Sequence, residues 1–195
     1  MSTIAQNTLL PKQPPISNGV LGMIILIITE SMFFAGLISA YVVNRAGVID
    51  WPPFDQPRLP VLVTGVNTVF LITSGLTLLF ARKRFLSNKN PMPLFFITMV
   101  LGLLFVGIQG YEWVKLIGYG LTASSSIYGS FFYTIIGMHG FHVLIGLSFL
   151  IYLWVIVKKN ISKENTIRKI NSCSLFWYFV VLIWPILYGL IYLDI

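Results

Sequence analysis

A carboxylate lies inside an apolar stretch near the start of the chain. Glu30 falls about midway along residues 18–43, within the run IITESMFFAGLISAYVV. An ionised acid at the centre of a bilayer costs on the order of 2.5–3.5 kcal/mol on insertion scales. A neutral carboxyl group, or a hydrogen-bonding partner inside a helix bundle, would lower this cost. An ionisable residue in such a place predicts a functional site, with a buried structural hydrogen bond as the alternative.

The two histidines of the chain stand three residues apart in the run GSFFYTIIGMHGFHVLIG. On a helix this spacing places His139 and His142 on neighbouring sides. The two axial ligands of a haem must approach from opposite faces, so this spacing does not suit a single haem. We therefore expect a histidine to hydrogen-bond to Glu30 or to a polar group on a neighbouring helix.

Three further polar residues are candidate site residues. Gln109 and Glu112 stand three apart in GIQGYEWVKL, whose aromatic residues are typical of a membrane interface. We interpret them as a satisfied polar helix end or as part of a functional site. Asn67 belongs to a polar face that lets helices pack closely and hydrogen-bond across the contact. The other members of that face recur at spacings of three, four and seven: Thr64, Thr68, Ser74 and Gly75.

The ligand inventory argues against a metal or haem centre in this chain. Glu30 and Glu112 are the only acids at or near membrane depth, whereas a di-iron bundle needs four carboxylates and two Glu-x-x-His pairs. The sequence contains no P-loop, G-x-G-x-x-G, Ser/His/Asp or C-x-x-C-H pattern, and the single cysteine, Cys173, suits a small apolar filler. We predict no catalytic residue, no cofactor-binding residue and no metal ligand.

Hydropathy predicts the elements that position these residues. The chain has 195 residues, of which 56% are hydrophobic and 10% charged, with a mean hydropathy of +0.85. Continuous apolar runs of about 20 residues predict transmembrane helices. We expect an all-α integral membrane bundle of five transmembrane helices, over residues 18–43, 60–81, 93–117, 128–157 and 173–193. They would form one domain, residues 18–195, after a polar segment, residues 1–17, which lacks the pattern of a cleaved signal peptide.

The basic residues are unevenly divided between the two sides that five crossings create. One side would hold ten: Lys12, Arg82, Lys83, Arg84, Lys89, Lys158, Lys159, Lys163, Arg168 and Lys169. The other would hold three: Arg45, Arg58 and Lys115. The positive-inside rule then predicts a cytoplasmic N-terminus and a C-terminus outside. Because the same bias accounts for the net charge of +7, we expect no nucleic-acid partner.

Taken together, several stretches resemble subunit III of the haem-copper terminal oxidases, best known in cytochrome c oxidase. ESMFFAGLISAYVV is similar to the glutamate-bearing helix of that family, WPP with NTVFLITSGLTL to its second block, and ITMVLGLLFVGIQGYEW to the next. The most specific match is YGSFFYTIIGMHGFHVLIGLSFLIYL, with both histidines in place. The likeness covers nearly the whole chain and is closest to the short, five-helix form of the family.

This resemblance implies a non-catalytic accessory subunit of a respiratory haem-copper oxidase, which couples oxygen reduction to proton pumping in aerobic electron transport. Haem and copper would belong to the catalytic subunit I, against which this chain would pack, together with subunit II. The chain would stabilise subunit I, support proton uptake and bind phospholipid. The short form favours a bacterial cytoplasmic (inner) membrane. Glu30 would be the intramembrane glutamate of the family, largely neutral and hydrogen-bonded within the bundle.

The chain departs from the family in its last helix. Many members read WHFVD where this chain reads WYFVV, so Tyr178 and Val181 replace a histidine and an aspartate. Any role of that pair in the family does not carry over. Related chains accompany quinol oxidases and nitric oxide reductases, which are alternative partner enzymes. A stand-alone transporter or proton channel that uses Glu30 is a second alternative, although no inverted repeat is evident. The ligand inventory opposes a third, a membrane haem or metal enzyme.

Overall fold

The structure is a computed structural model that describes residues 17–54, 56–159 and 162–193. The expected polar N-terminal segment, residues 1–17, therefore lies outside the described residues except for Ser17, and Lys12 lies outside with it. The described residues fold into five helices and contain no strand. Their bounds are α1 Asn18–Ala46, α2 Val61–Leu86, α3 Met92–Gly118, α4 Ile127–Lys158 and α5 Lys163–Tyr192. Each is long and apolar enough to cross a membrane, which confirms the predicted all-α fold class.

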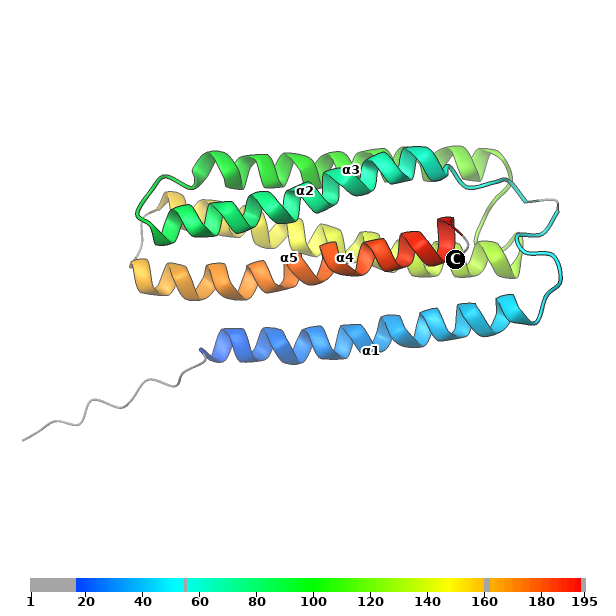
Figure 1. The fold of residues 1–195 in the computed structure, drawn as a ribbon, viewed down its shortest axis with the longest axis horizontal. Coiled ribbons are helices and arrows are strands. Elements are labelled where there is room, and N and C mark those ends of the chain that lie inside the picture. The colour runs from blue at the N-terminus through cyan, green and yellow to red at the C-terminus, as the bar shows by residue number, and fades with distance from the viewer. Residues whose placement is uncertain (1–16, 55, 160–161, 194–195) are drawn as a thin grey trace, which may run out of the picture.

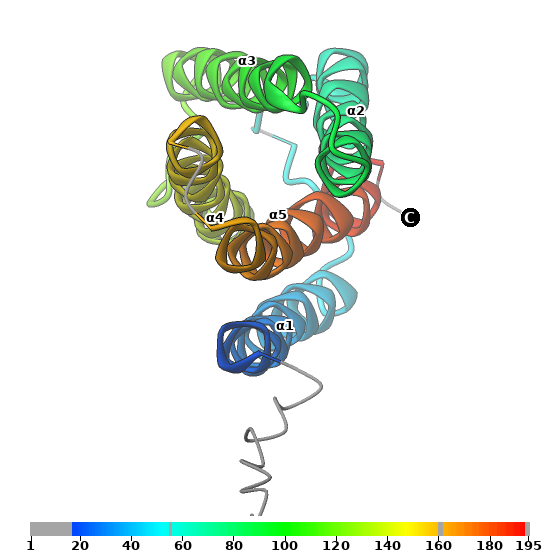
Figure 2. The same ribbon diagram turned by 90° about the vertical axis from the view of Figure 1, so that its left-hand side faces the viewer.

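Four of the helices form a closed ring, and the first helix lies beside it. In the ring, α2 packs on α3, α3 on α4, α4 on α5, and α5 back on α2. Figure 1 shows the long axes of the helices nearly aligned. Seen from the end, α1 lies outside the ring, where it contacts α5 and α4 (Figure 2). A hydrogen bond between Glu30 of α1 and a histidine of α4 would therefore join the outer helix to the ring.

The last helix begins at Lys163, ten residues before the start that hydropathy predicted. The added turns are polar but helical, because Arg168 pairs with Glu164 one turn earlier at 2.8 Å. Thr166 Oγ1 also donates to the Ser162 carbonyl oxygen at 3.1 Å. The helix α2 likewise continues past residue 81 to Leu86. Hydropathy thus located the apolar part of each helix and missed the basic turns that extend beyond it.

Local signals explain several helix ends. Ser17 and Ser126 cap α1 and α4, since their hydroxyl oxygens accept from the backbone N–H groups of Val20 and Gly129. After α3, Gly120 has a φ of +92°, and the N–H of Leu121 reaches back to the Leu116 carbonyl oxygen at 3.0 Å. This Schellman ending favours glycine because other residues rarely adopt a positive φ.

The core of the ring is built around Trp177 of α5, which is fully buried. Its indole Nε1 donates to Ser74 Oγ of α2 at 3.1 Å. The ring occupies space left by two glycines: a Cβ on Gly102 of α3 would stand 2.8 Å from Trp177 Cη2, and one on Gly146 of α4 would stand 2.7 Å from Cε3. One side chain therefore contacts all three of the other ring helices.

Four small residues of α1 lie on its exposed surface, and one of them, Ala35, borders the groove between α1 and α5. Ala35, Gly36, Ser39 and Ala40 are exposed, and a Cβ added to Gly36 would meet nothing within 4 Å. Within the most apolar stretch of α1 only 6% of residues are buried, against 28% to 44% in the other helices. Small residues allow close packing of helices, and this face of α1 makes no such contact with the ring.

The alternating helix directions gather most basic residues at one end of the bundle. The connections α2–α3 and α4–α5 lie at that end, together with the start of α1 (Figure 1). There Arg82 Nε donates to Asn171 Oδ1 at 2.9 Å and Lys163 Nζ donates to Asn88 Oδ1, which joins α5 to α2 and to the turn that follows it. The opposite end holds Arg45, Arg58 and Lys115. The structure therefore has the charge asymmetry that the sequence predicted.

A methyl group added at Gly102 should destabilise the bundle. Gly102→Ala forces its Cβ to within 2.8 Å of Leu147 and Trp177, and overpacking of this kind costs about 1–3 kcal/mol. Gly107→Ala, on the same helix, is the matched control because its Cβ would meet nothing within 4 Å. The midpoint of thermal unfolding in mild detergent should fall for Gly102→Ala alone. Equal midpoints would contradict the close packing of Trp177.

Candidate functional site

Glu30 of α1 and His142 of α4 meet at membrane depth. Glu30 Oε2 lies 3.0 Å from His142 Nε2, across 112 residues of sequence. The His142 side chain is 6% exposed and that of Glu30 is 24% exposed, so the pair lies at the edge of the ring rather than in its centre. The expected hydrogen bond of Glu30 is thus made with the second of the two candidate histidines.

The other ring nitrogen of His142 determines how many protons the pair holds. His142 Nδ1 lies 2.7 Å from the Met138 carbonyl oxygen, which can only accept, so Nδ1 carries a hydrogen. The contact between Nε2 and Oε2 then needs one proton, because two lone pairs would repel each other. This proton can reside on the imidazole, giving an ion pair, or on the carboxyl, giving a neutral pair. Either arrangement has no net charge, which reduces the cost of burying Glu30 in lipid.

Aromatic side chains surround the pair. Phe34 of α1 packs edge-on against the His142 ring at a centroid distance of 5.3 Å, and Phe176 of α5 stacks on it at 6.2 Å. Phe34 and Phe176 are both buried. The two phenylalanine side chains keep lipid and solvent away from His142 on the side that faces the four-helix ring. Glu30 is therefore the more accessible partner of the pair.

His139 lies one helical turn before His142 and has different neighbours. It is 1% exposed and stacks on Trp184 of α5, with ring centroids 4.8 Å apart, while Phe105 of α3 packs edge-on at 6.1 Å. Both of its ring nitrogens are buried without a hydrogen-bond partner in the described part of the chain. The two histidines therefore belong to separate environments, one polar pair and one aromatic stack.

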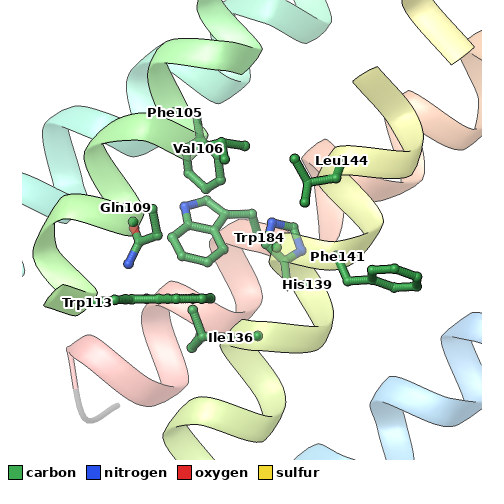
Figure 3. A pocket seen from close by; sticks show the side chains of 12 residues that line it. Phe105, Val106, Gln109, Trp113, Ile136, His139, Phe141, Leu144 and Trp184 are labelled. Atoms are coloured by element: carbon green, nitrogen blue, oxygen red, sulfur yellow. The ribbon is translucent and has the colours of Figure 1, made fainter. Parts of the chain in front are cut away.

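The side chain of His139 borders a cavity of about 230 Å³ between α3 and α4 (Figure 3). Its wall is mostly apolar and also includes Gln109 and Trp113. The remaining lining residues are Phe105, Val106, Gly110, Ile136, Gly137, Gly140, Phe141, Leu144 and Trp184.

Gln109, Glu112 and Asn67 do not join the pair formed by Glu30 and His142. Gln109 Nε2 donates to Tyr192 Oη at 2.8 Å, and Asn67 Nδ2 donates to the Phe105 carbonyl oxygen at 3.0 Å. Glu112 instead binds Lys115 of its own helix at 3.1 Å. Gln109 and Asn67 thus fasten α3 to α5 and α2, whereas Glu112 forms a polar helix end.

Sequence reasoning missed the part that α5 plays in this network. Aromatic residues of a membrane helix often face the lipid or the interface, but Trp177 and Trp184 of α5 are fully buried. Trp184 Nε1 donates to Thr68 Oγ1 at 2.8 Å, as Trp177 does to Ser74. The available signal was the hydroxyl groups of α2, which predicted a hydrogen-bonding partner without saying which helix supplied it.

The two positions that depart from the family pattern have different surroundings. Val181 fills the place next to Gly75 of α2, where an added Cβ would stand 3.2 Å from Val181 Cγ1. Tyr178 lines a groove between α5 and α1. Neither residue touches the pair formed by Glu30 and His142 through a hydrogen bond in the described residues.

No group of three or more His, Cys, Asp or Glu side chains in the described ranges is placed to hold a metal ion. Several polar side chains of the interior instead form hydrogen bonds that join helices. The fold and this site define an integral membrane helix bundle with an intramembrane acid–histidine pair.

Comparison with known proteins places the bundle in a family. Residues 7–194 match the family model described as cytochrome c oxidase subunit III. The chain is 35% identical over 177 residues to a probable cytochrome c oxidase subunit 3 of Nocardia farcinica, covering 88% of this chain and 85% of that protein. It is 32% identical to cytochrome c oxidase subunit 3 of a Synechocystis strain (88% and 74% covered) and 31% identical to that of Drosophila melanogaster (88% and 67% covered). The chain belongs to the cytochrome c oxidase subunit III family.

Substitutions of Glu30 should separate a hydrogen bond from a charge. Glu30→Gln keeps a donor for His142 Nε2 and should leave stability nearly unchanged. Glu30→Leu leaves that nitrogen unpaired and should cost about 1–3 kcal/mol. The double variant Glu30→Leu/His142→Leu should cost less than the sum of the single changes, since neither polar group remains. Thermal unfolding in mild detergent measures all four variants, His142→Leu included.

Equal and full stability of Glu30→Gln and Glu30→Leu would contradict a structural role for the bond. If both variants also showed a turnover defect in the assembled enzyme, the result would indicate a proton-linked role for Glu30 instead.

Proposed function

We propose that this chain is a non-catalytic accessory subunit of a respiratory haem-copper oxidase in a bacterial cytoplasmic membrane. Haem and copper belong to the catalytic subunit I, against which the chain packs together with subunit II. The observation that carries this proposal is the family match over residues 7–194, with relatives named cytochrome c oxidase subunit 3 across most of the chain. Electron transfer and oxygen reduction then take place in the partner subunits.

The exposed face of α1 supports assembly with other membrane subunits. Ala35, Gly36, Ser39 and Ala40 are exposed small residues at membrane depth, and a Cβ added to Gly36 would meet nothing within 4 Å in the described chain. Small residues let helix backbones approach closely, and close approach is a main source of helix association in lipid. We assign this face to a contact within the oxidase.

The pair formed by Glu30 and His142 supports two roles for the subunit. It stabilises the position of α1, because it is a polar contact between an outer helix and the ring. It also holds an exchangeable proton at membrane depth, with Glu30 as the more exposed partner. A proton held there supports proton uptake by the neighbouring catalytic subunit.

Two apolar grooves support phospholipid binding. One, of about 640 Å³, lies between α2 and α3 and has Tyr111 and Glu112 near one end. The other, of about 500 Å³, lies between α1 and α5 and is lined mainly by aliphatic side chains with Tyr178. Acyl chains match the apolar walls of both grooves.

Purification from the native host tests the proposed function. We expect the tagged chain, extracted in mild detergent, to carry with it a large hydrophobic partner that gives haem bands in a reduced-minus-oxidised spectrum. The band positions would distinguish a cytochrome c oxidase from a quinol oxidase or a nitric oxide reductase. A colourless protein without partners would contradict the proposal and favour a stand-alone transporter.

The charge asymmetry of the two ends predicts a cytoplasmic N-terminus and a C-terminus outside. Asn90→Cys, in the basic connection between α2 and α3, should be protected from a membrane-impermeant maleimide added to intact cells. Ser124→Cys, in the connection between α3 and α4, should react. The native Cys173 is buried and provides a low background. The reverse labelling pattern would overturn the orientation.

A further inference from the structure

The cavity between α3 and α4 combines an apolar wall with polar atoms that have no partner. Three of those atoms are both ring nitrogens of His139 and Nε1 of Trp113, all buried without a hydrogen bond in the described residues. An imidazole carries at least one N–H group in any protonation state, and an indole always carries one. At least two buried donors beside the cavity therefore have no partner in the described residues.

Several large polar side chains of the ring do have partners, although Tyr178 Oη, Asn67 Oδ1 and two hydroxyl groups away from the cavity are also unpaired in the described residues. Trp177, Trp184 and Gln109 each donate to a side chain of a neighbouring helix at 2.8 to 3.1 Å. Native proteins rarely leave buried donors unpaired, and an unpaired buried polar group usually marks a bound water or ligand. His139 and Trp113 are the two side chains lining the cavity that have unpaired atoms in the described residues, and His139, at 1% exposure, is the more deeply buried.

The space itself is created by missing side chains. Gly110 of α3 and Gly137 of α4 both line the cavity, and a Cβ added to either would meet no atom within 4 Å. The resulting volume of about 230 Å³ is enough for several water molecules, each of which takes about 30 Å³ in the liquid. A purely apolar cavity of this size would stay dry, but a water molecule needs only two to four polar partners.

We propose that this cavity is a built water site, in which a small cluster of ordered water molecules binds His139 and Trp113 at membrane depth. Water fits better than an acyl chain because an acyl chain would leave all three nitrogen atoms unpaired. Water can donate to one nitrogen of His139 and accept from the other, and it can also accept from the Trp113 N–H group.

The site lies beside the acid–histidine pair without being part of it. His139 and His142 are three residues apart on α4, and the pair already uses both nitrogens of His142. The cluster therefore lies on the neighbouring side of α4, where Trp184 stacks on His139.

Radiolytic hydroxyl labelling with mass spectrometry tests the site in the purified assembly that contains the chain. An X-ray pulse converts bound water into hydroxyl radicals, which modify the side chains next to it. Trp184 and Trp177 form a matched pair, since both lie on α5 at 0% exposure but only Trp184 lines the cavity. We expect Trp184 to be modified several-fold faster than Trp177.

Two variants separate the space from its polar atoms. Gly137→Val fills the cavity, and His139→Phe keeps an aromatic ring but removes both nitrogens. The difference in labelling between Trp184 and Trp177 should disappear in each variant. Equal labelling of the two tryptophans in the unaltered protein would overturn the proposal, because the cavity would then be dry or filled by an apolar chain. A difference that persists in both variants would also overturn it. Should a variant fail to assemble, the comparison in the unaltered protein still decides.

Discussion

Trp177 is the contact on which the ring of four helices depends. Its indole lies where Gly102 and Gly146 leave no side chain, and its N–H group binds Ser74. Lipid tails are as apolar as the side chains they would replace, so burial of apolar surface does little to hold helices together in a membrane. Close packing and hydrogen bonds between helices take over this role, and Trp177 packs closely on α3 and α4 and donates a hydrogen bond to α2.

The same chemistry recurs along the ring. Trp184 repeats the arrangement two turns further along α5 with Thr68 as its acceptor, and Tyr192 extends it to Gln109. The helix α5 therefore presents a row of large side chains whose polar atoms are satisfied by smaller partners on α2 and α3. This pattern explains why α2 carries hydroxyl and amide side chains in an otherwise apolar segment. They are acceptors and donors for the hydrogen bonds of the interior.

The sequence was sufficient to predict the number of helices and their apolar parts, because hydropathy over about 20 residues reports directly on the membrane. It could not predict where α5 begins, since residues 163–172 are helical for local reasons that hydropathy does not measure. Glu30 and the histidines were recognisable from their cost in lipid. The choice of His142 over His139 depends on how α1 turns against α4, and no pattern within one helix contains that information.

The positions of the aromatic residues of α5 could not be predicted from the sequence. A tryptophan in a membrane helix can face the interface, the lipid or another helix, and composition does not distinguish these places. The glycines that receive Trp177 lie 75 and 31 residues away in sequence, on two different helices. Recognising these glycines requires the three-dimensional packing, so the core of the four-helix ring could be identified only from the structure.

The distance in sequence between Glu30 and His142 has a consequence for biogenesis. Helix α1 is made first, yet the helices it contacts, α4 and α5, are made last. Glu30 therefore precedes its partner by 112 residues, which corresponds to roughly ten seconds of synthesis at typical translation rates. During that interval the nascent chain holds an uncompensated acid at the membrane. The insertion machinery has to shelter α1, or accept it with a protonated carboxyl, until the second histidine arrives.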